Sequence, residues 1–121
     1  MARHMDRLNR LQPAFKKKAI AVIEDMEKAG WHISVVYGFR TKKQNDALGN
    51  NASKTSKHLV GLAVDIIDTT VGYNIAYKNF GHPFCKDLER FCIKYGLYWG
   101  GNFVRTNSKN RWDPCHFQYK R

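Results

Sequence analysis

An aspartate inside a short apolar strand constrains this chain more than any other residue. Residues 62–67 read Leu-Ala-Val-Asp-Ile-Ile, so both faces of the strand are apolar except at Asp65. A strand of this kind is usually buried on both faces. A carboxylate taken out of water without a partner costs several kcal/mol, so Asp65 must be protonated, paired with a cation or bound to a metal ion. A metal ion is the most economical of these partners.

Two histidines could complete a metal site with Asp65. His58 lies seven residues earlier, which is roughly 23 Å of extended chain, whereas two donor atoms on one zinc ion lie only about 3–4 Å apart. The chain between them must therefore fold back, and Gly61 allows the turn because it takes positive φ at little cost. His116 would add a third ligand from a distant segment, with Asp113 three residues before it.

Length and composition predict one globular domain, residues 1–121. The hydrophobic fraction of 43% and the aromatic fraction of 13% exclude a disordered chain. No apolar run approaches the about 18 residues that a membrane span needs. The charged N-terminus runs directly into an amphipathic segment, which is not the pattern of a secretory signal.

The charge balance predicts a polyanionic partner. The chain has 21 Lys and Arg residues against 10 acidic residues, a formal net charge of +11. Nucleic acid, an anionic cell wall and acidic lipid all fit such an excess, and so does a solvated face that only aids solubility.

The three cysteines, Cys85, Cys92 and Cys115, are an odd number without a C-x-x-C pair, which favours reduced thiols. Cys115 adjoins His116 and is a possible ligand, but neighbouring side chains on an extended segment point to opposite faces.

Periodicity, capping signals and glycines predict an α+β fold. Apolar residues recur at helical spacing after Pro13 and before Gly30, and Thr41-x-x-Gln44 is typical of a capping box. Because helices and strands alternate without a regular βαβ order, we expect a small, mainly antiparallel sheet packed with helices. The predicted helices cover 13–29, 41–48 and 84–95, the predicted strands cover 31–39, 62–67, 97–103 and 115–119, and 49–57 is a polar loop.

Two sequence blocks resemble a known family. Residues 56–65 read Ser-x-His-x-x-Gly-x-Ala-x-Asp, and residues 112–117 read Trp-Asp-x-x-His-Phe. Together with Gly-Phe-Arg-Thr at 38–41 and Trp-Gly-Gly at 99–101, they resemble the zinc peptidases of the D-alanyl-D-alanine carboxypeptidase and L-alanyl-D-glutamate endopeptidase group. Phage endolysins of the L-alanyl-D-glutamate type look most similar. The chain departs from the pattern at Cys115 and in the loop 71–83.

The resemblance implies the fold of the hedgehog/DD-peptidase group and a role for each matching residue. His58, Asp65 and His116 would bind zinc, Asp113 would be the catalytic base, Arg40 would bind a substrate carboxylate or the developing oxyanion, and Ser56 would support the metal site by hydrogen bonding.

General chemistry agrees with these roles. Three protein ligands leave the fourth position of a tetrahedral zinc open for water, whose pKa falls to about 7. Asp113 could then take its proton and pass it to the leaving amine without a covalent intermediate. Structural alternatives stay open: Asp65 could pair with Arg40, Asp113 could be only a turn residue before Pro114, and Arg40 could be a surface cation.

The expected function is a monomeric zinc peptidase that hydrolyses the L-alanyl-D-glutamate bond of bacterial peptidoglycan. As a phage endolysin, it would accumulate in the host cytoplasm and reach the periplasmic peptidoglycan once another protein has permeabilised the membrane. One alternative is a D-alanyl-D-alanine carboxypeptidase or dipeptidase with the same metal, and another is a zinc module of the same fold without catalysis. A third is a basic nucleic-acid-binding protein or nuclease, but no binding motif supports specific nucleic-acid recognition.

Overall fold

A four-stranded antiparallel sheet organises the protein. The computed structural model describes residues 2–47, 57–72, 82–102 and 113–120. The strands have the order β1-β2-β4-β3, so the last strand along the chain lies inside the sheet. Their bounds are β1 Ile33–Tyr37, β2 Ala63–Asp68, β3 Tyr98–Trp99 and β4 His116–Gln118. The predicted α+β class with a small antiparallel sheet is confirmed.

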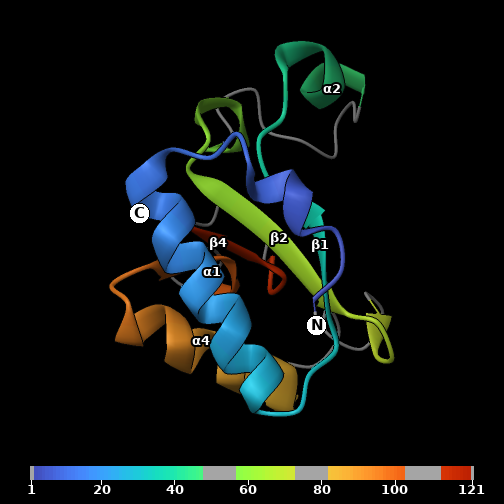
Figure 1. Cartoon of the computed structure of the whole chain (residues 1–121), viewed down its shortest axis with the longest axis vertical. Coiled ribbons are helices and arrows are strands. Elements are labelled where there is room, and N and C mark those ends of the chain that lie inside the picture. The colour runs from blue at the N-terminus through green and yellow to red at the C-terminus, as the bar shows by residue number, and fades with distance from the viewer. Residues whose placement is uncertain (1, 48–56, 73–81, 103–112, 121) are drawn as a thin grey trace.

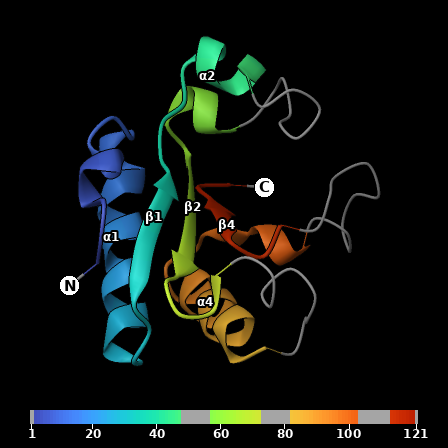
Figure 2. The same ribbon diagram turned by 90° about the vertical axis from the view of Figure 1, so that its right-hand side faces the viewer.

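Two long helices pack with the sheet. Helix α1 (Pro13–Lys28) lies along one side of it, as Figures 1 and 2 both show. Helix α4 (Pro83–Lys94) packs against α1 and β3. Each helix has a proline in its first turn, where no backbone N–H is needed, and a glycine with positive φ follows each end: Gly30 at 102° and Gly96 at 70°.

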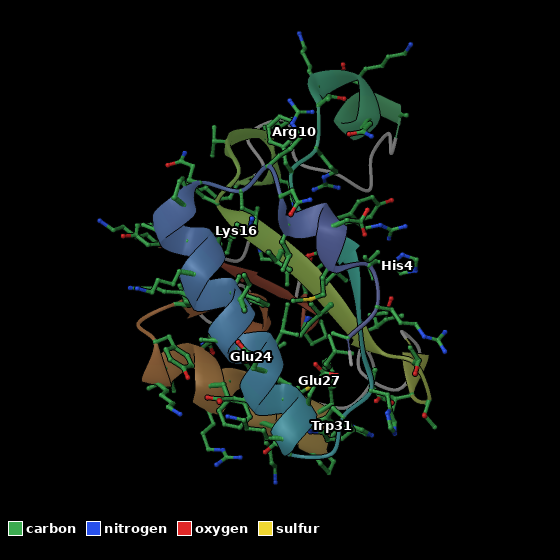
Figure 3. The ribbon with its side chains drawn as sticks, in the orientation of Figure 1. His4, Arg10, Lys16, Glu24, Glu27 and Trp31 are labelled. Carbon is green, nitrogen blue, oxygen red and sulfur yellow. The ribbon has the colours of Figure 1, made fainter. Side chains whose placement is uncertain are left out.

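Polar contacts tie the two helices together. The Asp25 carboxylate on α1 accepts hydrogen bonds from Lys94 Nζ at 2.9 Å and from the Tyr95 hydroxyl at 2.8 Å. Trp31, labelled at the end of α1 in Figure 3, donates from Nε1 to Asp87 of α4 at 2.8 Å. None of the helices in the described ranges is long and apolar enough to cross a membrane.

The alternation of side chains along β2 and β4 separates the core from the opposite face. Val64 and Ile66 of β2 and Phe117 of β4 are fully buried in one cluster with the apolar faces of α1 and α4. Phe15 of α1 contacts the Phe117 ring, with centroids 6.1 Å apart. Because successive strand residues point to opposite faces, Asp65 is directed away from the helices.

Helix α2 (Lys42–Ala47) begins with the predicted capping box. The Thr41 backbone N–H donates to Gln44 Oε1 at 3.0 Å, and the Gln44 N–H donates to Thr41 Oγ1 at 3.1 Å. These reciprocal bonds satisfy two of the donors that a helix leaves open at its start.

Three short 3₁₀ turns within the described ranges were not predicted. They are η1 (Met5–Leu8), η3 (Lys57–Val60) and η4 (Gly100–Asn102). The strand expected over 97–103 is therefore wrong beyond Trp99, and residue 103 lies outside the described residues. The chain turns into η4 at Gly100, whose backbone packs against the Asp113 carbonyl oxygen and leaves no room for a Cβ.

The N-terminal segment covers the outer edge of β1. Arg3 donates its N–H to the Ile33 carbonyl and accepts from Val35 N–H, and the Arg7 guanidinium donates to the carbonyls of Val35 and Val36. The strand expected over 31–39 is shorter, Ile33–Tyr37, and its register with β2 is irregular between Val35 and Tyr37. These contacts block an edge that could otherwise pair with another chain.

We expect Phe15→Ala to lower the free energy of unfolding by about 3–5 kcal/mol, because it leaves a cavity against Phe117 in the centre of the core. Urea denaturation followed by circular dichroism measures the loss. Ile93→Ala is the matched control, because Ile93 is 70% exposed on α4, and we expect it to change stability by less than about 0.5 kcal/mol. Equal effects of the two substitutions would show that the Phe15 contacts do not hold the core.

Candidate metal centre

The centre of the site is a row of side chains across three strands. Asp65 of β2 is paired with Tyr37 of β1 on one side and with His116 of β4 on the other. Antiparallel pairing brings directly opposed side chains within about 5 Å at Cβ, on the same face of the sheet. The sheet therefore places a carboxylate beside an imidazole from a segment 51 residues away.

Turn η3 brings His58 back to the same carboxylate. Gly61 follows the turn with a φ of 70°, as the sequence predicted, and its N–H bonds to the His58 carbonyl. An added Cβ on Gly61 would lie 3.1 Å from the Arg10 carbonyl oxygen, so both the conformation and the space favour glycine. His58 is 1% exposed as a result.

The three side chains form one compact donor group. Asp65 Oδ2 lies 3.2 Å from His58 Nε2, and Asp65 Oδ1 lies 2.9 Å from His116 Nδ1. One donor atom from each residue lies within 4.8 Å of the others. Tetrahedral zinc with nitrogen and oxygen ligands sets its donors about 3.3 Å apart, so the group is close to the size that this ion requires.

The outer nitrogen of each imidazole has its own acceptor. His58 Nδ1 lies 2.7 Å from the Gly38 carbonyl oxygen, and His116 Nε2 lies 2.8 Å from Gln118 Oε1. A carbonyl oxygen only accepts, so each outer nitrogen must carry the proton. The inner nitrogens, His58 Nε2 and His116 Nδ1, can then offer a lone pair, as metal-bound histidines do. The residues present therefore fit a zinc ion.

The electrostatics of the group are those of a buried anion beside two imidazoles. Burial raises the pKa of Asp65, but the His58 charge and hydrogen bonds from both histidines outweigh it, and the net pKa is below the ordinary value. Burial lowers the pKa of His116, but the hydrogen bond and charge of Asp65 outweigh that effect and raise it. Asp65 therefore stays ionised and stabilises the protonated, positively charged form of His116.

A second aspartate on β2, Asp68, is buried with a different kind of hydrogen-bond partner. The Asp68 carboxylate accepts backbone N–H bonds from His32 at 2.8 Å, Thr70 at 3.0 Å and Val71 at 2.9 Å. These donors come from neighbouring loops, so Asp68 is a structural residue that needs no cation. The Asp65 oxygens contact imidazole nitrogens instead, which can exchange a proton for a metal ion.

Asp113 lies at the margin of the group. Its Oδ2 is 3.9 Å from His116 Nδ1, and its side chain is 32% exposed. The Asp113 N–H bonds to the Gly100 carbonyl at 3.1 Å, and its own carbonyl accepts from His116 N–H at 3.1 Å. These bonds hold the Asp113 backbone beside the donors, while its carboxylate reaches solvent.

The Arg40 guanidinium lies over the face of the Tyr37 ring. Its backbone N–H bonds to the His58 carbonyl at 3.1 Å, and its guanidinium carbon lies 5.0 Å from the centre of the Tyr37 ring. The Tyr37 ring in turn contacts the His58 ring, with centroids 6.3 Å apart. Arg40 is 7% exposed, so it is not the surface cation that one alternative suggested. Ser56, the predicted supporting residue, lies outside the described residues.

Cys115 is directed away from the site. It is 1% exposed in the core cluster, and burial raises its pKa above the ordinary thiol value. Sequence reasoning missed Gly38 and Gln118, the two acceptors for the histidines. The spacing of Gln118, two residues after His116 on one strand face, is the signal that could have found it.

Comparison with known proteins gives the family. Residues 50–119, more than half of the chain, match the family model described as D-alanyl-D-alanine carboxypeptidase. The chain belongs to this peptidase family. Membership confirms the resemblance and the prediction of an enzyme, and the predicted zinc cofactor agrees with the donor set of this peptidase. No curated protein matches the chain in sequence.

Solved structures of peptidases share the fold. The LD-carboxypeptidase LdcB aligns with a TM-score of 0.69 and 18% identity over 90% of this chain, which spans 58% of the LdcB chain. The L-Ala D-Glu endopeptidase ChiX of Serratia marcescens aligns with a TM-score of 0.65 and 21% identity, over 98% of this chain and 90% of ChiX. A variant of the vancomycin resistance D,D-pentapeptidase VanY in complex with Zn(II) aligns with a TM-score of 0.67 and 15% identity, over 90% and 72%.

We expect zinc binding by this peptidase to weaken as the pH falls from about 8 to about 6, because a zinc ion must displace a proton from imidazole. The raised pKa of His116 keeps that proton in place at higher pH than in a free histidine, whereas Asp65 stays ionised throughout the range. Competition with a chromophoric chelator measures the affinity. Asp65→Asn, which removes the anion and one ligand, should bind zinc weakly at every pH. A wild-type affinity that does not change with pH would contradict this account.

Proposed function

We propose that the protein is a zinc-dependent peptidoglycan endopeptidase that hydrolyses the L-alanyl-D-glutamate bond of the stem peptide, acting as a monomer. One observation carries the proposal: His58, Asp65 and His116 form a compact donor group, with the half-buried Asp113 carboxylate 3.9 Å from one donor. One chain supplies every residue of this group. A zinc ion bound there supplies a Lewis acid and lowers the pKa of water to about 7.

Asp113 is suited to move the proton in this reaction. Water adds to the carbonyl carbon of the scissile amide, and the Asp113 carboxylate takes one of its protons. The C–N bond then breaks, and Asp113 returns that proton to the leaving amine nitrogen. Its exposure of 32% lets it reach both water and substrate, while its backbone bonds to Gly100 and His116 hold it in place.

Arg40 is suited to hold negative charge on the substrate. Its guanidinium is buried against Tyr37, where it is less screened than a surface cation. The charge can face a carboxylate of the stem peptide or the oxyanion that develops on the amide. The backbone bond from Arg40 to His58 couples this cation to the metal ligands.

The endopeptidase assignment is supported by the extent of the structural alignment. ChiX, an L-Ala D-Glu endopeptidase, is covered over 90% of its length, whereas LdcB is covered over 58%. The family description favours the second candidate, a D-alanyl-D-alanine carboxypeptidase. That reaction requires a free terminal carboxylate, so amidation of the substrate terminus would abolish it and leave the endopeptidase active.

We further propose that the protein is a phage endolysin. Its net charge of +11 suits an enzyme that works on an anionic cell wall. It would collect in the host cytoplasm and reach periplasmic peptidoglycan after the membrane is permeabilised. The support for this origin is the sequence resemblance to phage endolysins.

We expect Asp113→Asn to lower the rate of peptidoglycan hydrolysis by roughly 10²–10⁴-fold, because the amide keeps the shape but cannot take a proton. Zinc affinity should stay close to wild type, since Asp113 is not one of the three donors. The assay is digestion of purified Gram-negative peptidoglycan with mass spectrometry of the new termini. Glu24→Gln, a change on the outer face of α1 (Figure 3), is the control and should be fully active.

The products distinguish the candidates. New L-alanine carboxyl and D-glutamate amino termini, lost on chelation, would support the endopeptidase. Release of D-alanine alone would favour the carboxypeptidase. Inert cell walls together with tight, salt-dependent binding to DNA would favour a nucleic-acid-binding protein instead.

We expect cells that express the protein in their cytoplasm to lyse only when a membrane-permeabilising protein is expressed with it. The wall is out of reach of a cytoplasmic enzyme until the membrane opens. Turbidity of the culture measures lysis, and Asp113→Asn with the same permeabilising protein is the control. Lysis by the wild type alone would contradict the proposed location.

A further inference from the structure

We propose that Gln118 is a positioning residue that fixes the tautomer and ring orientation of His116 for metal binding. This inference rests on the proposed metallopeptidase function, and it concerns a residue that does not itself belong to the donor group. Gln118 follows His116 by two positions on β4, so both side chains lie on the face of the sheet that carries Asp65. It is 6% exposed, and a buried amide needs defined partners.

The contacts of Gln118 determine which way its amide points. Its Nε2 donates to the Lys120 backbone carbonyl at 2.6 Å, and its Oε1 lies 2.8 Å from His116 Nε2. Rotating the amide by half a turn would set its oxygen against the Lys120 carbonyl oxygen, so two acceptors would face each other. The amide oxygen therefore stays on the side of His116.

An acceptor at this place selects one tautomer of His116. Because the Gln118 oxygen can only accept, the His116 proton belongs on Nε2. Once a metal ion displaces the proton between Nδ1 and Asp65 Oδ1, which lie 2.9 Å apart, the lone pair is on Nδ1. The other neutral tautomer would donate from Nδ1 to Asp65 and close the donor group with a hydrogen bond in place of a metal ion. Gln118 disfavours that competing arrangement.

The two histidines are held by different means. His58 donates from Nδ1 to the Gly38 backbone carbonyl, which no side-chain substitution removes. His116 depends on the side chain of Gln118. The orientation of His116 can therefore be tested by mutation without changing the backbone or any donor residue.

The test compares two substitutions that preserve size. Gln118→Met has an unbranched side chain of similar length without a strong acceptor, and Gln118→Glu keeps an oxygen acceptor for His116. Removing such a partner of a metal-bound histidine typically costs 10–100-fold in metal affinity, so we expect a loss in this range for Gln118→Met. Gln118→Glu should recover part of the loss, because its carboxylate still accepts from His116 Nε2 but cannot donate to the Lys120 carbonyl as the Gln118 amide does. Lys120→Ala, which keeps the backbone carbonyl, is the control and should bind zinc like the wild type.

Two readouts besides activity are required. Competition with a chromophoric chelator gives the zinc dissociation constant. Long-range ¹⁵N–¹H correlation spectra of the zinc-loaded protein report which His116 nitrogen carries the proton. We expect a proton on Nε2 in the wild type and in Gln118→Glu, and a mixture or loss of that signal in Gln118→Met.

Two results would overturn the inference. One is a zinc affinity of Gln118→Met equal to that of the wild type. The other is an equal loss in Gln118→Met and Gln118→Glu that follows a lowered melting temperature of both metal-free proteins, which would mark a purely structural residue. Because these readouts need no substrate, a wild type that binds zinc but leaves peptidoglycan intact would refute the proposed function alone.

Discussion

The site and the sheet both depend on the Asp65 carboxylate. Its two oxygens face His58 and His116, so a turn and a distant strand converge on one side chain. Without these partners an ionised carboxylate in the centre of a largely buried strand would be unstable, and with them it forms the anionic part of the candidate donor group. Asp68 of the same strand differs, because three backbone N–H groups donate hydrogen bonds to its carboxylate.

The sequence predicted the parts of the protein in which local signals and burial agree. Helix α1, the Thr41–Gln44 capping box and the turn at Gly61 each follow from a few adjacent residues. The grouping of His58, Asp65 and His116 followed from the cost of burying Asp65 and from the family resemblance. Contacts between distant parts of the chain could not be predicted. Nothing local to Gly100 shows that the Asp113 carbonyl will pack on it, and nothing in the sequence reveals that the Gly38 carbonyl will accept from His58.

The residues of the site fall into a rigid group and a more accessible group. His58, His116 and Gln118 are at most 6% exposed, and each has a fixed partner beyond the donor group. Asp113 is 32% exposed and lies on the turn that leads into β4. Such a division suits the proposed hydrolysis, because the donors must hold a constant geometry while Asp113, the proposed proton carrier, meets water and substrate.

Because β4 lies inside the sheet, the donor group can assemble only when the sheet itself folds. β4 is the last strand along the chain, yet it pairs with both β2 and β3, and His116 joins Asp65 across 51 residues. Long-range pairing of this kind forms late, after the cost of closing a large loop has been met. A growing chain on the ribosome therefore carries two of the three candidate donors, His58 and Asp65, but no complete donor group until β4 has emerged and inserted. The insertion of β4 therefore completes both the sheet and the group of residues that the proposed hydrolysis requires.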